Sequence, residues 1–193
     1  MNRSERGGGG AIFVDDKLIF IQRLDLNSFA NKNVQCVFIE ITDVLFKNRI
    51  VGTIYRPPDT NLDLFMNGFE SLFNILSKTK AECLLAGDYN INLLKHNVHE
   101  GTAIFINCLY ANSFVLLITK PTRFGNTLSI LIDNIFTNKC NNSASSGLLI
   151  TDISDHLPVF YISKYEVKTN SLKFVNHQEL YLNQILRHYG RIG

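Results

Sequence analysis

Apolar side chains recur along this chain with two periods, one typical of helices and one typical of strands. Over residues 62–76 they return at steps of three and four, which predicts an amphipathic helix packed on a sheet. A polar side chain among residues 59–61 can cap the start of that helix. Residues 101–111, apolar on most faces, predict a second helix.

Short apolar runs around these helices predict β-strands. Residues 11–14 and 18–21, separated by a turn at Asp15-Asp16, are expected to pair as a hairpin. A strand over residues 49–55 should end at Pro57-Pro58, because proline lacks the N–H that a ladder needs. The remaining expectations are strands at 35–41, 83–86 and 157–162, a short strand or turn at 114–118, an apolar segment at 128–136 and a polar loop at 141–147.

Strands and helices alternate along the chain and are mixed with hairpins. This order indicates an α/β fold with a mixed sheet, in which two sheets pack face to face with helices outside. We expect one domain over residues 7–163. It begins at a glycine run, residues 7–10, which lacks the Lys-Ser/Thr ending of a phosphate-binding loop and is interpreted as a turn into the first strand.

The two ends of the chain differ in character from this domain. Residues 1–6 are expected to form a disordered N-terminus, and residues 164–193 a linker tail. The tail has a weak helical pattern at Leu180, Tyr181 and Ile185, which suggests a short helix.

The composition agrees with a globular domain: the 193 residues are 46% hydrophobic and 19% charged. The net charge of +2 does not by itself indicate nucleic-acid binding. The four cysteines form no CxxC pair, which argues against a structural zinc site. The N-terminus lacks the apolar stretch of a signal peptide, and no apolar run is long enough to span a bilayer. We therefore expect a nuclear or cytoplasmic protein that is neither secreted nor membrane-bound.

Polar clusters interrupt the apolar runs at or near the ends of the expected strands. Functional sites are commonly built where strand ends meet at one edge of a sheet. The clusters are Tyr55-Arg56-Pro57-Pro58, Gly87-Asp88-Tyr89-Asn90, Ile132-Asp133-Asn134 and Ser154-Asp155-His156.

Together these residue types suit phosphodiester hydrolysis. The carboxylates of Asp88 and Asp155 are hard oxygen ligands for Mg²⁺ or Mn²⁺. Asp133 can hold His156 in one tautomer and keep it cationic. The side chains that can donate to a phosphate or orient a water are Tyr55, Arg56 and Asn90.

Taken singly, each cluster also has a structural interpretation, and these alternatives stay open. Gly87-Asp88 is a common turn sequence. A buried Asp133 could accept hydrogen bonds from the backbone, since burying a carboxylate is costly unless it is paired. His156 alone could be a structural histidine.

In their order along the chain, these clusters resemble the endonuclease/exonuclease/phosphatase family, and in detail the endonuclease domain of non-LTR (LINE-like) retrotransposons. The resemblance runs from about Gly7 to Ile162. It is carried by GGGAIFV from Gly8, IYRPP from Ile54, LAGDYNINLL from Leu85, KPTR from Lys120, LIDNIFTN from Leu131 and DISDHLP from Asp152.

The resemblance implies a fold and a set of roles. The fold would be a DNase I-like sandwich of two mixed β-sheets flanked by helices. Asp88 is similar to the Asp that aligns or deprotonates the attacking water, Asn90 to its partner, and Tyr55 to the Tyr at the scissile phosphate. Asp133 and His156 resemble the pair that stabilises phosphate charge, and Asp155 a metal-site Asp. The residues expected at phosphate or DNA are Arg56, Thr122, Arg123 and Asn134.

One departure from the family pattern changes the expected activity. The family begins with an Asn-bearing strand, a helix and a strand that ends in a metal-binding Glu, whereas here the glycine run follows Met1 by six residues. We therefore expect a fold that misses this first strand-helix-strand, binds Mg²⁺ or Mn²⁺ weakly and does not cleave DNA. The reverse transcriptase domain that normally shares the family's polyprotein is also absent from this sequence.

Three functional hypotheses follow. The first is a metal-dependent endonuclease domain acting on DNA, inactive or residually active in this chain. The second is a phosphatase or lipid phosphodiesterase of the same superfamily, against which the YRPP and KPTR motifs argue. The third is a non-enzymatic or decayed fragment that binds nucleic acid or nothing. Whether the chain is an enzyme stays open from its sequence.

Overall fold

The computed structural model describes most of the expected domain: residues 9–29, 34–42, 48–125, 128–140, 142–164 and 179–183. The expected disordered segment 1–6 and the start of the glycine run lie outside these ranges. Within them, no helix has both the length and the apolar character needed to cross a membrane.

Six strands form the larger sheet, in the order β1-β2-β3-β4-β8-β5. β3 and β4 run parallel, and every other neighbouring pair in this sheet is antiparallel. The strands are β1 (Phe20–Gln22), β2 (Gln35–Ile41), β3 (Arg49–Tyr55), β4 (Glu82–Asp88), β5 (Val115–Leu116) and β8 (Asp133–Thr137).

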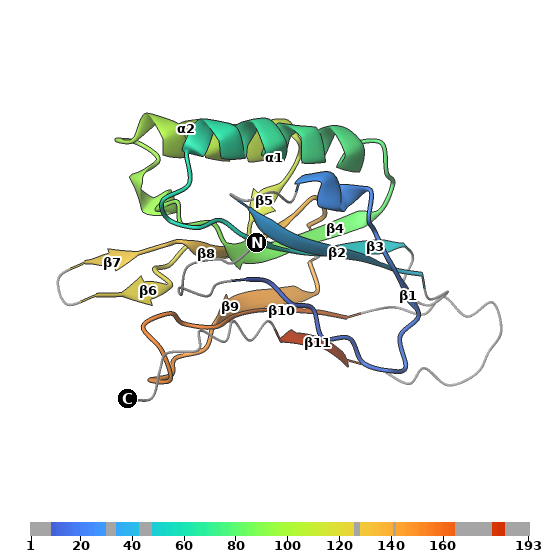
Figure 1. The fold of residues 1–193 in the computed structure, drawn as a ribbon. Helices are drawn as coiled ribbons and strands as arrows, with labels where there is room; N and C mark the ends of the chain where they lie inside the picture. The colour runs from blue at the N-terminus through green and yellow to red at the C-terminus, as the bar shows by residue number, and fades with distance from the viewer. Residues whose placement is uncertain are drawn as a thin grey trace, which may run out of the picture.

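A second sheet lies on the opposite side of the larger sheet from the helices (Figure 1). It consists of β9 (Ala144–Leu148), β10 (Val159–Lys164) and β11 (Glu179–Asn183), with β10 in the middle. A separate two-stranded hairpin, β6 (Arg123–Phe124) and β7 (Ser129–Ile130), extends from the side of the molecule (Figure 1). This arrangement confirms the expected α/β sandwich of two sheets with helices outside.

Helices α1 (Leu62–Leu76) and α2 (Glu100–Ala111) cover one face of the larger sheet (Figure 1). As expected, a polar side chain caps α1: Asn61 Oδ1 accepts from Leu64 N at 3.1 Å. Two short 3₁₀ helices, η1 (Leu26–Phe29) and η3 (Leu93–Lys95), complete the described elements.

The core between the helices and the sheet is rich in aromatic rings. Phe69 of α1 contacts Phe105 of α2, with ring centroids 5.1 Å apart, and Tyr89 contacts Phe136 of β8 at 4.7 Å. All four side chains are fully buried. Burial of one such side chain is worth about 1.5–3 kcal/mol, so this cluster is a main source of stability. Tyr89 also connects the core to the end of β4.

The expected N-terminal hairpin is wrong. Residues 11–14 form no strand, and β1 pairs instead with β2, Phe20 lying opposite Ile41. Ile12 and Val14 still turn inward, against a small cluster around Ile39. The apolar run at 11–14 therefore contributes two side chains to a core cluster, but its backbone supplies no hydrogen bonds to a strand ladder.

Two further expectations are corrected near the C-terminus. The polar loop expected at 141–147 is largely strand β9, in which Gly147 pairs with Phe160 of β10. Backbone pairing does not require apolar side chains. The mostly polar sequence of β9 therefore gave no hydrophobic pattern from which a strand could be predicted. Leu180 and Tyr181 lie in strand β11 rather than in a helix, and Ile185 lies outside the described residues.

Candidate functional site

The site begins with three strands whose ends are in register. Tyr55 at the end of β3 is the register partner of Asp88 at the end of β4, and Asp88 is the partner of Asp133 at the start of β8. Register partners project to the same face of a sheet. Topology alone therefore brings these residues, 33 or more positions apart in sequence, to one edge.

Gly87 makes this close approach of strands possible. It lies opposite Ile54 in the parallel β3–β4 pair, and a Cβ atom at this position would overlap the Ile54 carbonyl oxygen. The glycine of Gly87-Asp88 is therefore a packing requirement within a strand, and the turn follows after Asp88.

Asp133 and His156 form a buried pair. His156 Nδ1 lies 3.2 and 3.1 Å from the two carboxylate oxygens of Asp133, which is itself fully buried. Burial lowers the pKa of His156, but the hydrogen bond and charge of Asp133, together with the charge of Asp88, outweigh it and leave that pKa raised. A cationic imidazole donating through Nδ1 fits this geometry.

Asp88 faces the same pair and is only 2% exposed. Burial, and then repulsion from Asp133, raises the pKa of the Asp88 carboxyl to about 7. One ligand atom each from Asp88, Asp133 and His156 lies within 4.8 Å of the others, a spacing at which the three could share a cation. We call these three residues the acid–imidazole group.

A tight turn follows Asp88. Asp88 Oδ1 accepts from Asn90 N at 3.0 Å, and Asn90 adopts a positive φ of 47°. Asn tolerates this left-handed conformation better than most residues. The Asn90 side-chain amide donates to the Arg56 carbonyl oxygen at 2.8 Å, which joins the turn to the end of β3.

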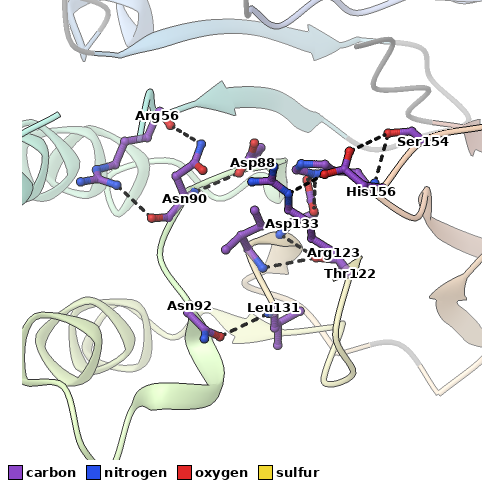
Figure 2. A network of polar contacts seen from close by, with 12 residues as sticks. Arg56, Asp88, Asn90, Asn92, Thr122, Arg123, Leu131, Asp133, Ser154 and His156 are labelled. Atoms are coloured by element: carbon purple, nitrogen blue, oxygen red, sulfur yellow. Dashed lines mark hydrogen bonds and ion pairs between the residues drawn. The ribbon is translucent and has the colours of Figure 1, made fainter. Parts of the chain in front are cut away.

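The Arg56 side chain lies on the other side of that turn. It is buried, and its guanidinium donates to the carbonyl oxygens of Tyr89, Asn90 and Thr60. Figure 2 shows it directed away from Asp88, Asp133 and His156. The expectation that Arg56 donates to phosphate does not fit this placement.

Thr122 and Asn134 are also buried in the described structure, with no exposed surface. The Thr122 hydroxyl accepts from the N–H groups of Ile132 and Asp133, at 3.2 and 3.1 Å (Figure 2). The Asn134 side chain pairs with both backbone groups of Ile118, donating to its oxygen at 2.8 Å and accepting from its nitrogen at 3.2 Å. These contacts hold β8 in place and do not fit the expected roles at DNA.

Arg123 and Asp155 are the exposed part of the site. Arg123 Nε donates to Asp155 Oδ2 at 2.8 Å, and both side chains are about half exposed. The Arg123 side chain is accessible, and its expected role at phosphate stays a prediction. Among the described residues Asp155 does not join the acid–imidazole group, so its role as a metal ligand stays a prediction.

Two supporting residues had no role in the sequence interpretation. Ser154 Oγ accepts from His156 N at 3.1 Å and so fixes the turn over residues 154–156, which we call the histidine turn. Asn92 Oδ1 accepts from Leu94 N and Leu131 N, both at 3.3 Å, and joins η3 to the segment before β8. The signal for Asn92 was its position before a short helical turn, where such a side chain is a preferred cap.

Comparison with known proteins defines the fold. No protein-family model and no curated protein matches the sequence. The structure is similar to the endonuclease domain of TRAS1, a telomere-specific non-LTR retrotransposon, with a TM-score of 0.58 and 16% identity over 76% of this chain and 67% of that one. This likeness shows the endonuclease/exonuclease/phosphatase-like fold that the motifs implied.

Two further solved structures are similar at lower scores. One is an endonuclease/exonuclease/phosphatase family protein from Bacteroides thetaiotaomicron, with a TM-score of 0.43 and 14% identity over 65% of this chain and 54% of that one. The other is the 3′ phosphatase NExo from Neisseria bound to a product DNA hairpin, with 0.44 and 15% over 81% and 72%. The chain thus spans about half to three quarters of these proteins.

Proposed function

We propose that the acid–imidazole group belongs to a divalent-metal-dependent phosphodiesterase site that acts on DNA, and that its activity in this chain is residual. The observation that carries the proposal is the buried group of Asp88, Asp133 and His156 at the joined ends of β4 and β8. Two carboxylates held together inside a protein are costly unless charge is neutralised nearby.

The donor set fits a hard divalent cation, but incompletely. Burial and repulsion from Asp133 destabilise the charged form of Asp88 and raise its pKa to about 7. A cation beside Asp88 would offset this destabilisation. Mg²⁺ and Mn²⁺ prefer oxygen ligands, which Asp88 supplies. Asp133 is engaged with His156, so among the described residues the group offers one readily available carboxylate. We therefore expect weak binding.

Each residue of the site would have a defined task in the hydrolysis. Asp88 would orient the attacking water and accept its proton. Asn90, fixed beside it, would hold the water or a phosphoryl oxygen through its amide. His156, kept cationic by Asp133, would donate to a phosphoryl oxygen, and the Tyr55 hydroxyl would do the same from β3. As the new P–O bond forms, the P–O bond to the leaving oxygen would break, and that oxygen would take a proton from solvent water. A bound Mg²⁺ or Mn²⁺ would supply neutralisation of phosphoryl charge.

DNA is the proposed substrate because the fold is that of the TRAS1 endonuclease domain and because Arg123 is an exposed cation beside the group. In a retrotransposon polyprotein, a reverse transcriptase domain would be the functional partner of such a domain.

The test is nicking of supercoiled plasmid in Mg²⁺ or Mn²⁺. The sequence alone led us to expect no cleavage, but because Asp88, Asp133 and His156 lie together we now expect slow, metal-dependent nicking. This nicking should disappear in Asp88→Ala and His156→Ala. Glu70→Ala, which removes an exposed carboxylate on α1, is the matched control and should nick at the unaltered rate.

Three outcomes would contradict the proposal. Robust nicking lost in Asp88→Ala would contradict the residual activity. Hydrolysis of sphingomyelin or an inositol phosphate, without action on DNA, would identify a lipid phosphodiesterase or phosphatase. Salt-dependent DNA binding without any turnover would identify a non-enzymatic fragment.

A further inference from the structure

Arg56 is a buried arginine that the proposed chemistry does not use. It directly follows β3 and is 6% exposed. Burying a guanidinium is costly, and an apolar side chain of similar volume is often as good or better for stability at such a position. The carbonyl contacts of Arg56 therefore call for an explanation beyond packing.

Those contacts converge on one turn. The guanidinium donates to the Asn90 carbonyl oxygen at 3.1 Å and to that of Tyr89 at 3.4 Å. The Arg56 backbone contacts the same turn from its own strand: its N–H donates to Asp88 O at 3.0 Å, and its carbonyl oxygen accepts from Asn90 Nδ2 at 2.8 Å. Arg56 is thus bonded to three consecutive residues of the site.

The turn has a reason to need this support. Asn90 has a positive φ, and its backbone N–H is held by the Asp88 carboxylate. If Asn90 relaxed to a right-handed conformation, this hydrogen bond and the orientation of the Asp88 carboxylate would be lost together. A third carbonyl contact, to Thr60, and the face of the Phe65 ring, 5.8 Å away, fix the guanidinium itself.

We propose that Arg56 is a positioning residue, which holds the Asp88–Asn90 turn in the conformation that presents both side chains to metal and substrate while making no contact with either. The proposal rests on the proposed function for its catalytic consequence, but not for its structural one. The hydrogen bonds of Arg56 Nη1 go to the Tyr89 and Asn90 carbonyl oxygens, and that of Nη2 goes to the Thr60 carbonyl oxygen. Figure 2 shows the guanidinium directed away from Asp88, Asp133 and His156.

The test compares Arg56→Met with Arg56→Lys. Methionine keeps an unbranched side chain against Phe65 but cannot donate, whereas lysine keeps the charge and can reach one or two carbonyls. Four quantities are measured in each folded variant: the Mn²⁺ dissociation constant, the hydrogen-exchange rate of the Asn90 side-chain amide by NMR, and kcat and KM on a DNA duplex.

We expect Arg56→Met to weaken Mn²⁺ binding and to lower kcat by about 10- to 100-fold, the usual effect of removing a supporting partner, with KM little changed. Exchange at the Asn90 amide should accelerate, and Arg56→Lys should recover part of each loss. Arg23→Met is the matched control, because Arg23 forms a part-buried ion pair with Glu40 away from the site. It should leave all four quantities unaltered.

Unchanged Mn²⁺ affinity and unchanged Asn90 exchange in Arg56→Met would overturn the proposal. A raised KM with unchanged kcat would also overturn it, because such kinetics indicate that Arg56 contacts the substrate directly. If Arg56→Met does not fold, wild-type values in Arg56→Lys would overturn it. A wild-type chain without any turnover refutes the proposed function only, because metal affinity and Asn90 exchange still decide the role of Arg56.

Discussion

Asp88 and Asp133 are register partners across the β4–β8 ladder, so two carboxylates from different strands are buried against each other. His156 contacts Asp133, and the charges of His156 and Arg123 lower the pKa of Asp88 by less than burial and Asp133 raise it. Its burial and the charge of Asp133 together raise its pKa to about 7. The pair is therefore unfavourable for stability near neutral pH and suited to recruiting a cation.

The first prediction concerns stability and pH. The pKa of Asp88 is raised from its ordinary 3.8 to about 7 on folding. Between these values the folded state binds more protons than the unfolded state, so stability falls as pH rises through this window. Asp88→Asn should therefore raise the free energy of unfolding at pH 8 by a few kcal/mol, at about 1.4 kcal/mol per pKa unit, and change it little at pH 4.

Urea unfolding at the two pH values measures this difference. Asp63→Asn, at an exposed position on α1, is the control and should alter stability by less than about 0.5 kcal/mol at either pH. An equal gain at pH 4 and pH 8 in Asp88→Asn would show that charge is not its cause.

The second prediction concerns the Asp133–His156 pair. Asp133→Asn removes the hydrogen bond and charge that raise the pKa of His156. It also removes the repulsion that adds to burial in raising the pKa of Asp88. Both pKa values should fall, which NMR titration of the imidazole and carboxyl resonances measures. Asp152→Asn, an exposed neighbour of the histidine turn, should change neither; a His156 pKa unaltered in Asp133→Asn would refute the pairing.

The third prediction separates support from DNA contact at Thr122. Thr122→Val keeps the shape but removes the acceptor for two buried N–H groups, those of Ile132 and Asp133. Each unsatisfied group costs about 1–3 kcal/mol, so thermal unfolding should show a large loss. Thr122→Ser retains the hydroxyl and should lose only about 1 kcal/mol. Weaker DNA binding at unaltered stability in Thr122→Val would instead favour a contact with the DNA backbone.

The fourth prediction concerns the strand before the site. In Gly87→Ala, the new methyl group meets the Ile54 carbonyl oxygen, which belongs to the backbone and cannot move without opening the β3–β4 pair. We expect a loss of several kcal/mol or no folded protein, measured by soluble yield and melting temperature. Gly125→Ala is the control, because its added Cβ lies 3.4 Å from its nearest neighbour, an ordinary contact.

The parts of the fold that sequence predicted are those with a strong local signal. The helix over Leu62–Leu76 and the strands Gln35–Ile41 and Arg49–Tyr55 have the predicted bounds, because burial and periodicity coincide there. Residues 11–14 are apolar but form no ladder, whereas Ala144–Leu148 forms a ladder without an apolar pattern. Whether each segment forms a strand depends on a pairing partner that is distant in sequence. A local pattern carries no information about such partners.

The site divides in a similar way. Asp133 has a sequence signal of its own, because a carboxylate in an apolar run needs a partner. Asp88 and His156 were selected only by the order of motifs that resembles the family. The direction in which a long or buried side chain points could not be predicted from the sequence. Arg56 lies beside a predicted site residue yet points toward the core, and Asn134 lies beside Asp133 yet pairs with a neighbouring backbone. Adjacent residues of a strand face opposite sides of the sheet. A residue next to a site residue in the sequence therefore need not belong to the site.

Tyr89 lies between Asp88 and Asn90 but points the other way, into the aromatic core, where it contacts Phe69, Phe105 and Phe136. The turn from Asp88 to Asn90 is therefore fastened to the interior by the residue at its centre. A substitution deep beneath the surface, such as Phe105→Leu, should alter the conformation of that turn. The aromatic layer thus restricts the sequence changes that the candidate site can accumulate while keeping its geometry.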